Sequence, residues 1–234
     1  GDDLAYFWDL RGGRFTNGTT ETDPVVQVAF LGGIAYPVSL TVTEVGGEGR
    51  STEVFVPINV EGQEGEIRGA LQAWHPMDIV FHGPVTSEAA DDPNPFLDYR
   101  LVVTFTGPNG QTYDIPGFYD GDGEGGSSGD VWRVRFAPDE GGLWSYTTIF
   151  RTMTRAALHE DLDSGTATHF HGASGSFGVL PVDPNAEGFL GKGRLDYVGA
   201  RYLKHADGGF FLKGGTDSPE NLMGYAGFDD IQDN

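Results

Sequence analysis

Hydrophobic and polar residues alternate with period two along most of the chain, and turns rich in Gly, Asn, Asp and Pro interrupt them every 8 to 12 residues or so. This pattern is typical of an all-β sandwich, and the helical period is nearly absent. The alternation is clearest at Tyr36, Val38, Leu40 and Val42, which share one face, and at 54–60 after a glycine-rich turn. These two runs are predicted to pair as a β-hairpin.

A polar, glycine-rich stretch at 61–65 separates this hairpin from a second series of strands. The alternation resumes at 99–105, 132–136 and 144–150, where Trp132, Trp144 and Tyr146 fall on the apolar face. The turn at 138–142 predicts that the last two runs form a second hairpin over the core. We therefore predict two β-sandwich modules in tandem, at residues 1–62 and 63–185.

The pattern changes after Pro184. Short strands are predicted within 194–206 and 209–213, and Ser218 and Pro219 are the residue types of a helix N-cap and of a first helical position. A strand, a glycine-bearing loop and a capped helix form the beginning of a β/α unit. Residues 186–234 are therefore predicted to be a separate short β/α segment.

The charge of the chain excludes some classes of partner. The 234 residues include 14 Lys and Arg against 35 Asp and Glu, which gives a formal net charge of −21. Nucleic-acid binding and binding to anionic membranes both require clustered positive charge, so neither is expected. No run approaches the roughly 20 apolar residues of a membrane-spanning helix. The acidic excess keeps a protein soluble and hydrated, as in a salty extracellular setting. A start without Met, directly at a predicted strand, leads us to expect a processed or truncated product.

The glycine-rich loop after residue 119 is a candidate cation site. Asp120, Asp122 and Glu124 occur at spacing two and precede Gly125, which follows the start of a D-x-D-x-D-G calcium loop. Val131 occupies the position of the closing Glu, with Asp130 one residue earlier. The prediction is a calcium ion held by Asp120, Asp122, Glu124 and Asp130, and the alternative is a solvated acidic hairpin tip. The loop also satisfies G-x-G-x-x-G, but a strand rather than a helix follows it, which argues against a phosphate site.

Two kinds of side chain are candidates for contacting a ligand. Arg133 and Arg135 point away from the predicted core and could bind a carboxylate or sulfate group, although cross-strand pairing with Asp or Glu is the alternative. Trp74 and Tyr119 are candidates for a surface on which a sugar ring stacks, because the other large aromatic residues fall on the inward face. The absence of Cys excludes disulfides and thiolate metal sites.

The first 60 residues resemble the polycystic-kidney-disease (PKD) type domain. The matching segments are Tyr6-Phe7-Trp8-Asp9-Leu10, Asp23-Pro24-Val25-Val26 and the hairpin that begins Tyr36-Pro37-Val38-Ser39-Leu40. The resemblance implies an Ig-like sandwich that acts mostly as a spacer in secreted proteins. The opening strands of that family would precede Gly1.

Residues 63–185 resemble the Ig-like domain of unknown function at the N-terminus of proteins classed as bacterial glycoside hydrolases. Five segments carry the resemblance in the right order, namely 81–84 (FHGP), 94–99 (NPFLDY), 116–123 (PGFYDGDG), 132–136 (WRVRF) and 142–146 (GLWSY). In such proteins a catalytic (β/α)8 barrel follows this domain. Residues 210–222 of this chain resemble the first strand and helix of such a barrel. The resemblance implies that Asp217 and Glu220 would lie at the mouth of that barrel, and that the catalytic carboxylates would come from later strands.

The sequence therefore predicts a non-catalytic accessory portion of a secreted, polysaccharide-degrading glycoside hydrolase, in which the modules act as spacers or bind glycan. Its partners would be a polysaccharide or cell-surface glycan and the catalytic barrel of the parent protein. No catalytic residue is assigned. The alternative is a structural protein of the cell surface or of an extracellular filament.

Overall fold

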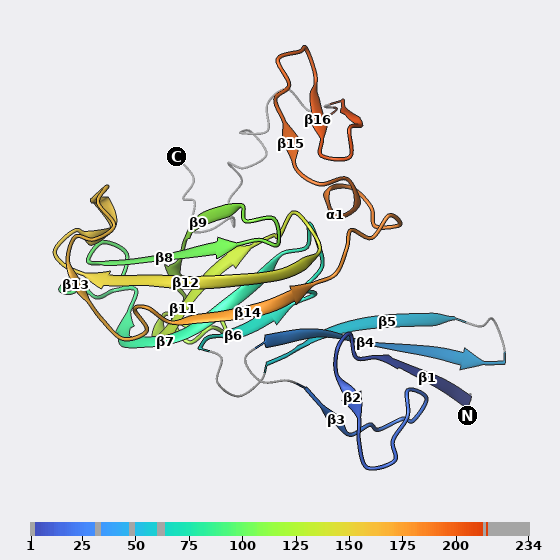
Figure 1. Cartoon of the computed structure of the whole chain (residues 1–234). Coiled ribbons are helices and arrows are strands. Elements are labelled where there is room, and N and C mark those ends of the chain that lie inside the picture. Colours follow the sequence, from blue (N-terminus) through green and yellow to red (C-terminus); the bar gives the residue numbers. More distant parts are fainter. Residues whose placement is uncertain (1–2, 31–33, 47–49, 60–63, 213, 215–234) are drawn as a thin grey trace, which may run out of the picture. The chain divides into compact units, whose positions relative to one another are not determined.

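The fold is nearly all β, as predicted. The structure is a computed structural model, and it describes residues 3–30, 34–46, 50–59, 64–212 and 214. Residues Gly1–Gly191 cluster into one compact unit, and the residues from Lys192 onward belong to a second. Figure 1 shows the strands of the first unit as β-sheets layered on one another.

The larger sheet runs in the order β1-β4-β14-β12-β8-β9, with β5 also paired to β4 and β13 to β12. The bounds of its strands are β1 Asp3–Asp9, β4 Ile34–Val45, β5 Ser51–Ile58, β8 Tyr99–Thr106, β9 Thr112–Pro116, β12 Gly142–Thr152, β13 Thr166–Ala167 and β14 Ser174–Val179. A short 3-10 helix at Ala156–Leu158 follows β12.

The second sheet has the order β10-β11-β7-β6 and covers the inner face of β8 and β12 (Figure 1). Its strands are β6 Glu66–Gly69, β7 Met77–Ser87, β10 Phe118–Tyr119 and β11 Ser128–Phe136. A separate ribbon pairs β2 Arg14–Phe15 with β3 Val28–Ala29. The helix α1 spans Phe189–Lys192, and among the described residues no helix has the length and apolarity that a membrane span requires.

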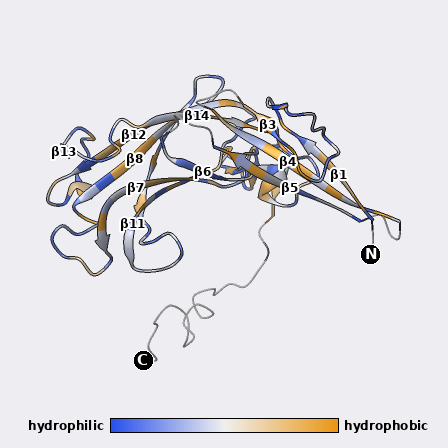
Figure 2. Ribbon diagram, turned by 90° about the horizontal axis from the view of Figure 1, so that it is seen from below, coloured by the Kyte–Doolittle hydropathy of each residue, from blue (hydrophilic) through white to orange (hydrophobic). Residues whose placement is uncertain are grey.

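The inward residues of the two sheets form one core. Trp132 and Val134 of β11 meet Phe150 and Trp144 of β12, and the Trp132 and Phe150 rings lie 4.8 Å apart between centroids. The prediction that Trp132, Trp144 and Tyr146 face inward is confirmed, because each is at most 1% exposed. Each such side chain stabilises the fold by roughly 1.5–3 kcal/mol relative to its exposed state. Figure 2 shows the alternation of apolar and polar residues along the strands.

The predicted hairpin between 132–136 and 144–150 is wrong. β11 pairs with β7 and β10, whereas β12 pairs with β8, β13 and β14, so the turn after Phe136 carries the chain from one sheet to the other. Both strands still direct their aromatic residues into the same core, from opposite sides. Alternation alone could not distinguish a connection between two sheets from a hairpin within one sheet. In both cases the apolar residues lie on one face of each strand.

The predicted hairpin near the N-terminus is confirmed. β4 and β5 pair antiparallel, with Val38 opposite Val56 and Leu40 opposite Val54. A small apolar cluster of Leu10, Tyr36 and Val38 lies in this region, apart from the main core. β4 also pairs parallel with β14, with Ala35 opposite Phe177. The division into modules near 62–65 stays a prediction.

Within its described residues, the second unit contains three short antiparallel strands, β15 Leu195–Asp196, β16 Leu203–His205 and β17 Phe210–Phe211. These strands lie within the two predicted stretches. The helix expected from Ser218, together with Asp217 and Glu220, lies outside the described residues. The start of a catalytic barrel therefore stays a prediction.

Candidate functional site

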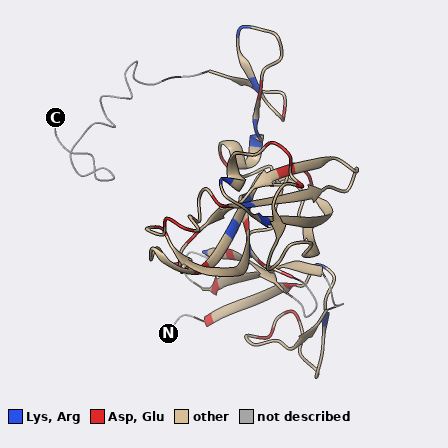
Figure 3. Ribbon diagram, turned by 90° about the vertical axis from the view of Figure 1, so that its left-hand side faces the viewer, with Lys and Arg blue, Asp and Glu red and all other residues tan. Residues whose placement is uncertain are grey.

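Arg133 and Arg135 lie on the outer face of the four-stranded sheet, as predicted, and both bind carboxylates. Arg135 is opposite Asp78 in the register of β11 and β7, and its Nε and Nη2 donate to the two carboxylate oxygens at 2.8 and 3.0 Å. Arg133 donates from Nη1 to Asp78 at 2.9 Å and from Nε to Asp120 at 2.7 Å. Cross-strand pairing, the alternative role for these arginines, is therefore what the structure contains. Acidic residues are scattered over many strands and loops, and basic residues are few (Figure 3).

The two arginines differ in their exposure. The side chain of Arg133 is 10% exposed, because the loop after Asp120 folds over it and the Gly123 carbonyl accepts from its Nη2. The side chain of Arg135 is 61% exposed. Burial raises the pKa of the Asp78 carboxyl, but the hydrogen bonds and charges of Arg135 and Arg133 together bring that pKa below its ordinary value. Binding of a ligand by Arg133 or Arg135 stays a prediction.

The acidic loop uses its carboxylates within the protein. Asp122 accepts hydrogen bonds from the backbone N–H groups of Glu124 and Gly126 at 2.8 and 2.9 Å, and these lower the pKa of its carboxyl. Asp130 lies 3.0 Å from Nδ1 of His82. In the described ranges, no three His, Asp or Glu residues are grouped so that they could hold a metal ion. The calcium prediction is not tested by this arrangement and stays a prediction.

The two predicted stacking residues are largely covered. Tyr119 is only 3% exposed, and its hydroxyl donates to the Thr86 carbonyl at 2.6 Å and accepts from the Gly129 N–H at 2.9 Å. Trp74 is partly buried against the main core, and its backbone N–H donates to the Pro138 carbonyl at 2.7 Å. Neither ring is an open platform. One face of Tyr119, however, lines a cavity.

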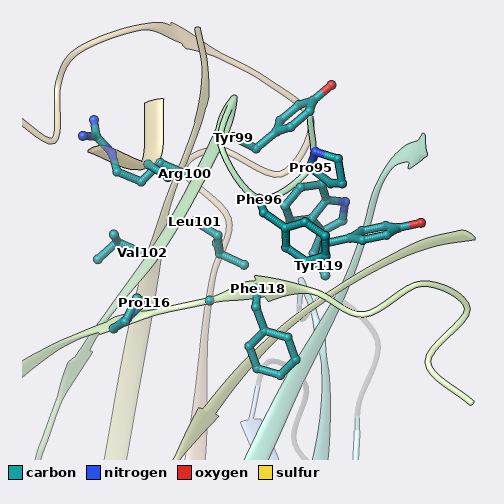
Figure 4. A pocket seen from close by; sticks show the side chains of 12 residues that line it. Pro95, Phe96, Tyr99, Arg100, Leu101, Val102, Pro116, Phe118 and Tyr119 are labelled. Atoms are coloured by element: carbon teal, nitrogen blue, oxygen red, sulfur yellow. The ribbon is translucent and has the colours of Figure 1, made fainter. Parts of the chain in front are cut away.

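This cavity, the aromatic pocket, has a volume of about 290 Å3 and opens between the two sheets where β9 passes into β10. Its lining is mostly aromatic and apolar and includes Phe96, Tyr99, Leu101, Phe118, Tyr119 and Trp132. Figure 4 shows the ring of Phe96 beside that of Tyr119, and the ring of Phe118 on the opposite side of its strand. Ligand sites of proteins are typically concave, mostly apolar and roughly 300–1,000 Å3 in volume, so the aromatic pocket is slightly smaller than that range.

A densely hydrogen-bonded loop positions Phe96. The Asn94 side chain accepts from the backbone N–H groups of Phe96 and Leu97 at 2.9 and 3.1 Å. Asp98 closes the same turn by accepting from the backbone N–H groups of Asn94 and Arg155, both at 2.8 Å, and these bonds lower the pKa of its carboxyl. Phe96 is thus held in place although its side chain is 48% exposed.

The opposite wall depends on Gly117, between β9 and β10. Its N–H donates to the Leu101 carbonyl at 2.9 Å, and a Cβ at this position would lie 2.3 Å from Cδ2 of Leu101. Only glycine permits this approach. The chain can therefore cross here from β9 in one sheet to β10 in the other, where Tyr119 faces the core and Phe118, which is 40% exposed, faces outward with Arg133.

Phe96, Tyr99 and Phe118 are not among the site residues predicted from the sequence. Phe96 lies in a loop and Phe118 in a strand of two residues. Neither segment is long enough to show an alternation of apolar and polar residues. A signal was nevertheless present, because 94–99 and 116–123 are two of the five segments that carry the resemblance to the glycoside hydrolase-associated domain.

The family comparison concerns the same region. Residues 70–151 match the model of a family described as "Domain of unknown function (DUF5060)". Among solved structures, the chain is similar to a "putative glycoside hydrolase" from Bacteroides vulgatus, with 26% identity over 60% of this chain and a TM-score of 0.41. The chain spans 21% of the length of that structure. Among curated proteins, the search found no match.

Proposed function

We propose that this chain is a non-catalytic accessory portion of a secreted, polysaccharide-degrading glycoside hydrolase. The observation that carries the proposal is the family match over 70–151, because it contains all five segments that resemble the Ig-like domain of such enzymes. In this proposal the PKD-like N-terminal strands act as a spacer, and the residues after the sandwich lead into a catalytic barrel. The polysaccharide is the partner outside the cell.

Several carboxyl groups of the described residues are held in their ionised form by the fold. Wherever the described part of the chain clearly shifts the pKa of a carboxyl group, the shift is downward, at Glu66, Asp78, Asp98, Asp122 and Asp161. Hydrogen bonds from arginine side chains, from backbone N–H groups or from a serine hydroxyl contribute to each of these shifts, as expected for carboxylates that stabilise the fold.

The test has two parts. The purified chain is incubated with a panel of plant and algal polysaccharides, and release of reducing sugar is measured beside an active glycoside hydrolase as positive control. We expect no release above the rate with boiled protein, and reproducible release would overturn the accessory role. Mass spectrometry of the protein from its natural source is expected to give a mass well above that of these 234 residues. A natural product of this mass alone would instead favour the structural alternative.

A further inference from the structure

The edge of β8 lacks a partner strand over its first three residues. β12 pairs with the whole of β8, but β9 pairs only with Val102–Thr106, because the chain leaves this sheet at Gly117. On this side of Tyr99–Leu101, the one hydrogen bond between described residues runs from the Gly117 N–H to the Leu101 carbonyl. Tyr99, Leu101 and Gly117 all line the aromatic pocket, so the cavity lies beside the open edge.

The pattern of an antiparallel ladder identifies the backbone groups that face this edge. In such a ladder, the N–H and C=O of one residue point to the same neighbouring strand, and those of the next residue point to the other. The Leu101 carbonyl accepts from Gly117 on the β9 side, at 2.9 Å. The Asp98 carbonyl accepts from Met153 on the β12 side, at 3.1 Å. The N–H and C=O of Tyr99 and the N–H of Leu101 therefore face the open edge, and no described residue pairs with them.

The unpaired N–H of Leu101 belongs to a covered residue, which is only 2% exposed. More than about 90% of the buried backbone groups of proteins are paired, because an unpaired one costs a free energy comparable to that of a lost hydrogen bond. A buried donor that lacks a partner at the wall of a cavity is therefore a group that a ligand can satisfy.

An extended peptide has the backbone groups that match this edge. Along β8 the open groups are a donor, an acceptor and a donor, and an extended peptide presents an acceptor, a donor and an acceptor at the same spacing. Figure 4 shows Leu101 and Val102 of β8 to the left of the rings of Phe96 and Tyr119. Because the lining of the cavity is mostly aromatic and apolar, the side chains of the peptide should be apolar as well.

The charge of the chain distinguishes between acidic and basic peptides. A formal net charge of −21 attracts cations and repels anions over a distance of about a Debye length. A peptide with Lys or Arg beside its apolar residues is complementary to this field, and a peptide with Asp or Glu at those positions is not.

We propose that the open edge of β8 binds an extended segment of another polypeptide, apolar at its centre and basic at its ends. The segment pairs with the backbone of Tyr99 and Leu101 as an added strand, where β9 has left the sheet. Its apolar side chains pack on Phe96 and Tyr119. This partner is separate from the polysaccharide of the proposed function, and the inference does not rest on that function.

The test is an NMR titration of the isotope-labelled chain with a capped peptide of sequence Lys-Val-Tyr-Val-Lys. We expect saturable shifts of the backbone amides of Tyr99 and Leu101, and hydrogen exchange of these two amides that is slower by about fivefold or more at saturation. The amides of Arg100 and Val103 are the internal controls. They face β12 and β9, which already pair with them, so their exchange should not change.

Modified peptides separate strand pairing from side-chain contact. Three versions carry one N-methyl group each, on the first Val, the Tyr or the second Val. At least one of them is expected to bind about tenfold more weakly, because it lacks an N–H that the ladder uses. The version with Glu in place of both Lys is expected to bind more weakly at low salt, and the difference should shrink as salt is added. Cellohexaose is the carbohydrate probe.

Phe96→Ala is expected to weaken binding of the Lys peptide about tenfold. Phe7→Ala is the matched control, because Phe7 is an aromatic residue of similar exposure, 53% against 48%, on β1. It should leave binding unchanged, and thermal melting should confirm that both variants are folded. The proposal is overturned if the Lys peptide gives no shifts at about 10 mM, if cellohexaose alone shifts the Tyr99 and Leu101 amides, or if the Glu peptide binds more tightly. It is also overturned if all N-methylated versions, or the Phe96→Ala chain, bind as the unmodified pair does.

Discussion

Asp78 and Arg133 form an ion pair on the outer face of the four-stranded sheet, with 2.9 Å between Oδ2 and Nη1, and the two side chains are only 15% and 10% exposed. Asp78 also accepts hydrogen bonds from Nε and Nη2 of Arg135, so one carboxylate joins two arginines of β11 to β7. Asp120 extends the network to the loop that follows β10.

Asp78→Asn is expected to lower the free energy of unfolding by about 1–3 kcal/mol, because it leaves the covered guanidinium of Arg133 with one carboxylate instead of two. The contribution of Arg135 is discounted, since its side chain is largely in water. Denaturant unfolding measures the change. Glu66→Gln is the control, because the pair of Glu66 with Arg68 is exposed and should contribute less than about 0.5 kcal/mol. Equal losses in the two variants would contradict the prediction.

The same carboxylate should make stability depend on pH. The pKa of Asp78 is lower in the folded chain than its unfolded value of about 3.9, so its contribution is fully present above that value. It is lost as the pH falls through the folded pKa. The difference in unfolding free energy between the natural chain and Asp78→Asn should be constant from about pH 6 to 5 and should shrink below about pH 4. A difference that grows in acid would reverse the sign and refute the assignment.

Gly117→Ala is expected to destabilise the fold by about 1–3 kcal/mol and to disturb the aromatic pocket. The new methyl group would lie 2.3 Å from Cδ2 of Leu101, which is buried, and 2.9 Å from the Arg133 carbonyl, which is backbone. Gly178→Ala on β14 is the control, since its nearest neighbour would be at an ordinary 3.6 Å. Thermal melting of both variants separates the steric effect from a general intolerance of alanine.

The calcium hypothesis can be tested in solution. If Asp120, Asp122, Glu124 and Asp130 bind calcium, the melting temperature should rise in millimolar calcium relative to chelator, because a ligand that binds only the folded state stabilises it. Asp122→Asn should reduce that rise. A melting temperature that is the same in calcium and in chelator would leave the internal hydrogen bonds of Asp122 as the role of this loop.

The fold class and the inward residues could be predicted because a strand that covers a core alternates apolar and polar residues. Trp132, Trp144 and Tyr146 follow this alternation. Strand pairing could not be predicted for β11 and β12, because their partners β7 and β8 lie far away in the sequence and only the packed structure selects them. The sequence predicted that Arg133 and Arg135 point away from the core, but it did not predict Asp78 as their shared partner. The aromatic pocket escaped prediction because loops and a corner, rather than a periodic strand, position its rings.

The parallel pairing of Ala35 with Phe177 has a consequence for how the protein is made. During synthesis on the ribosome, β4 emerges long before β14, so its backbone donors and acceptors on that side must wait for most of the first unit to be translated. Until then the nascent chain carries an unpaired β edge, which is the kind of surface on which chains aggregate.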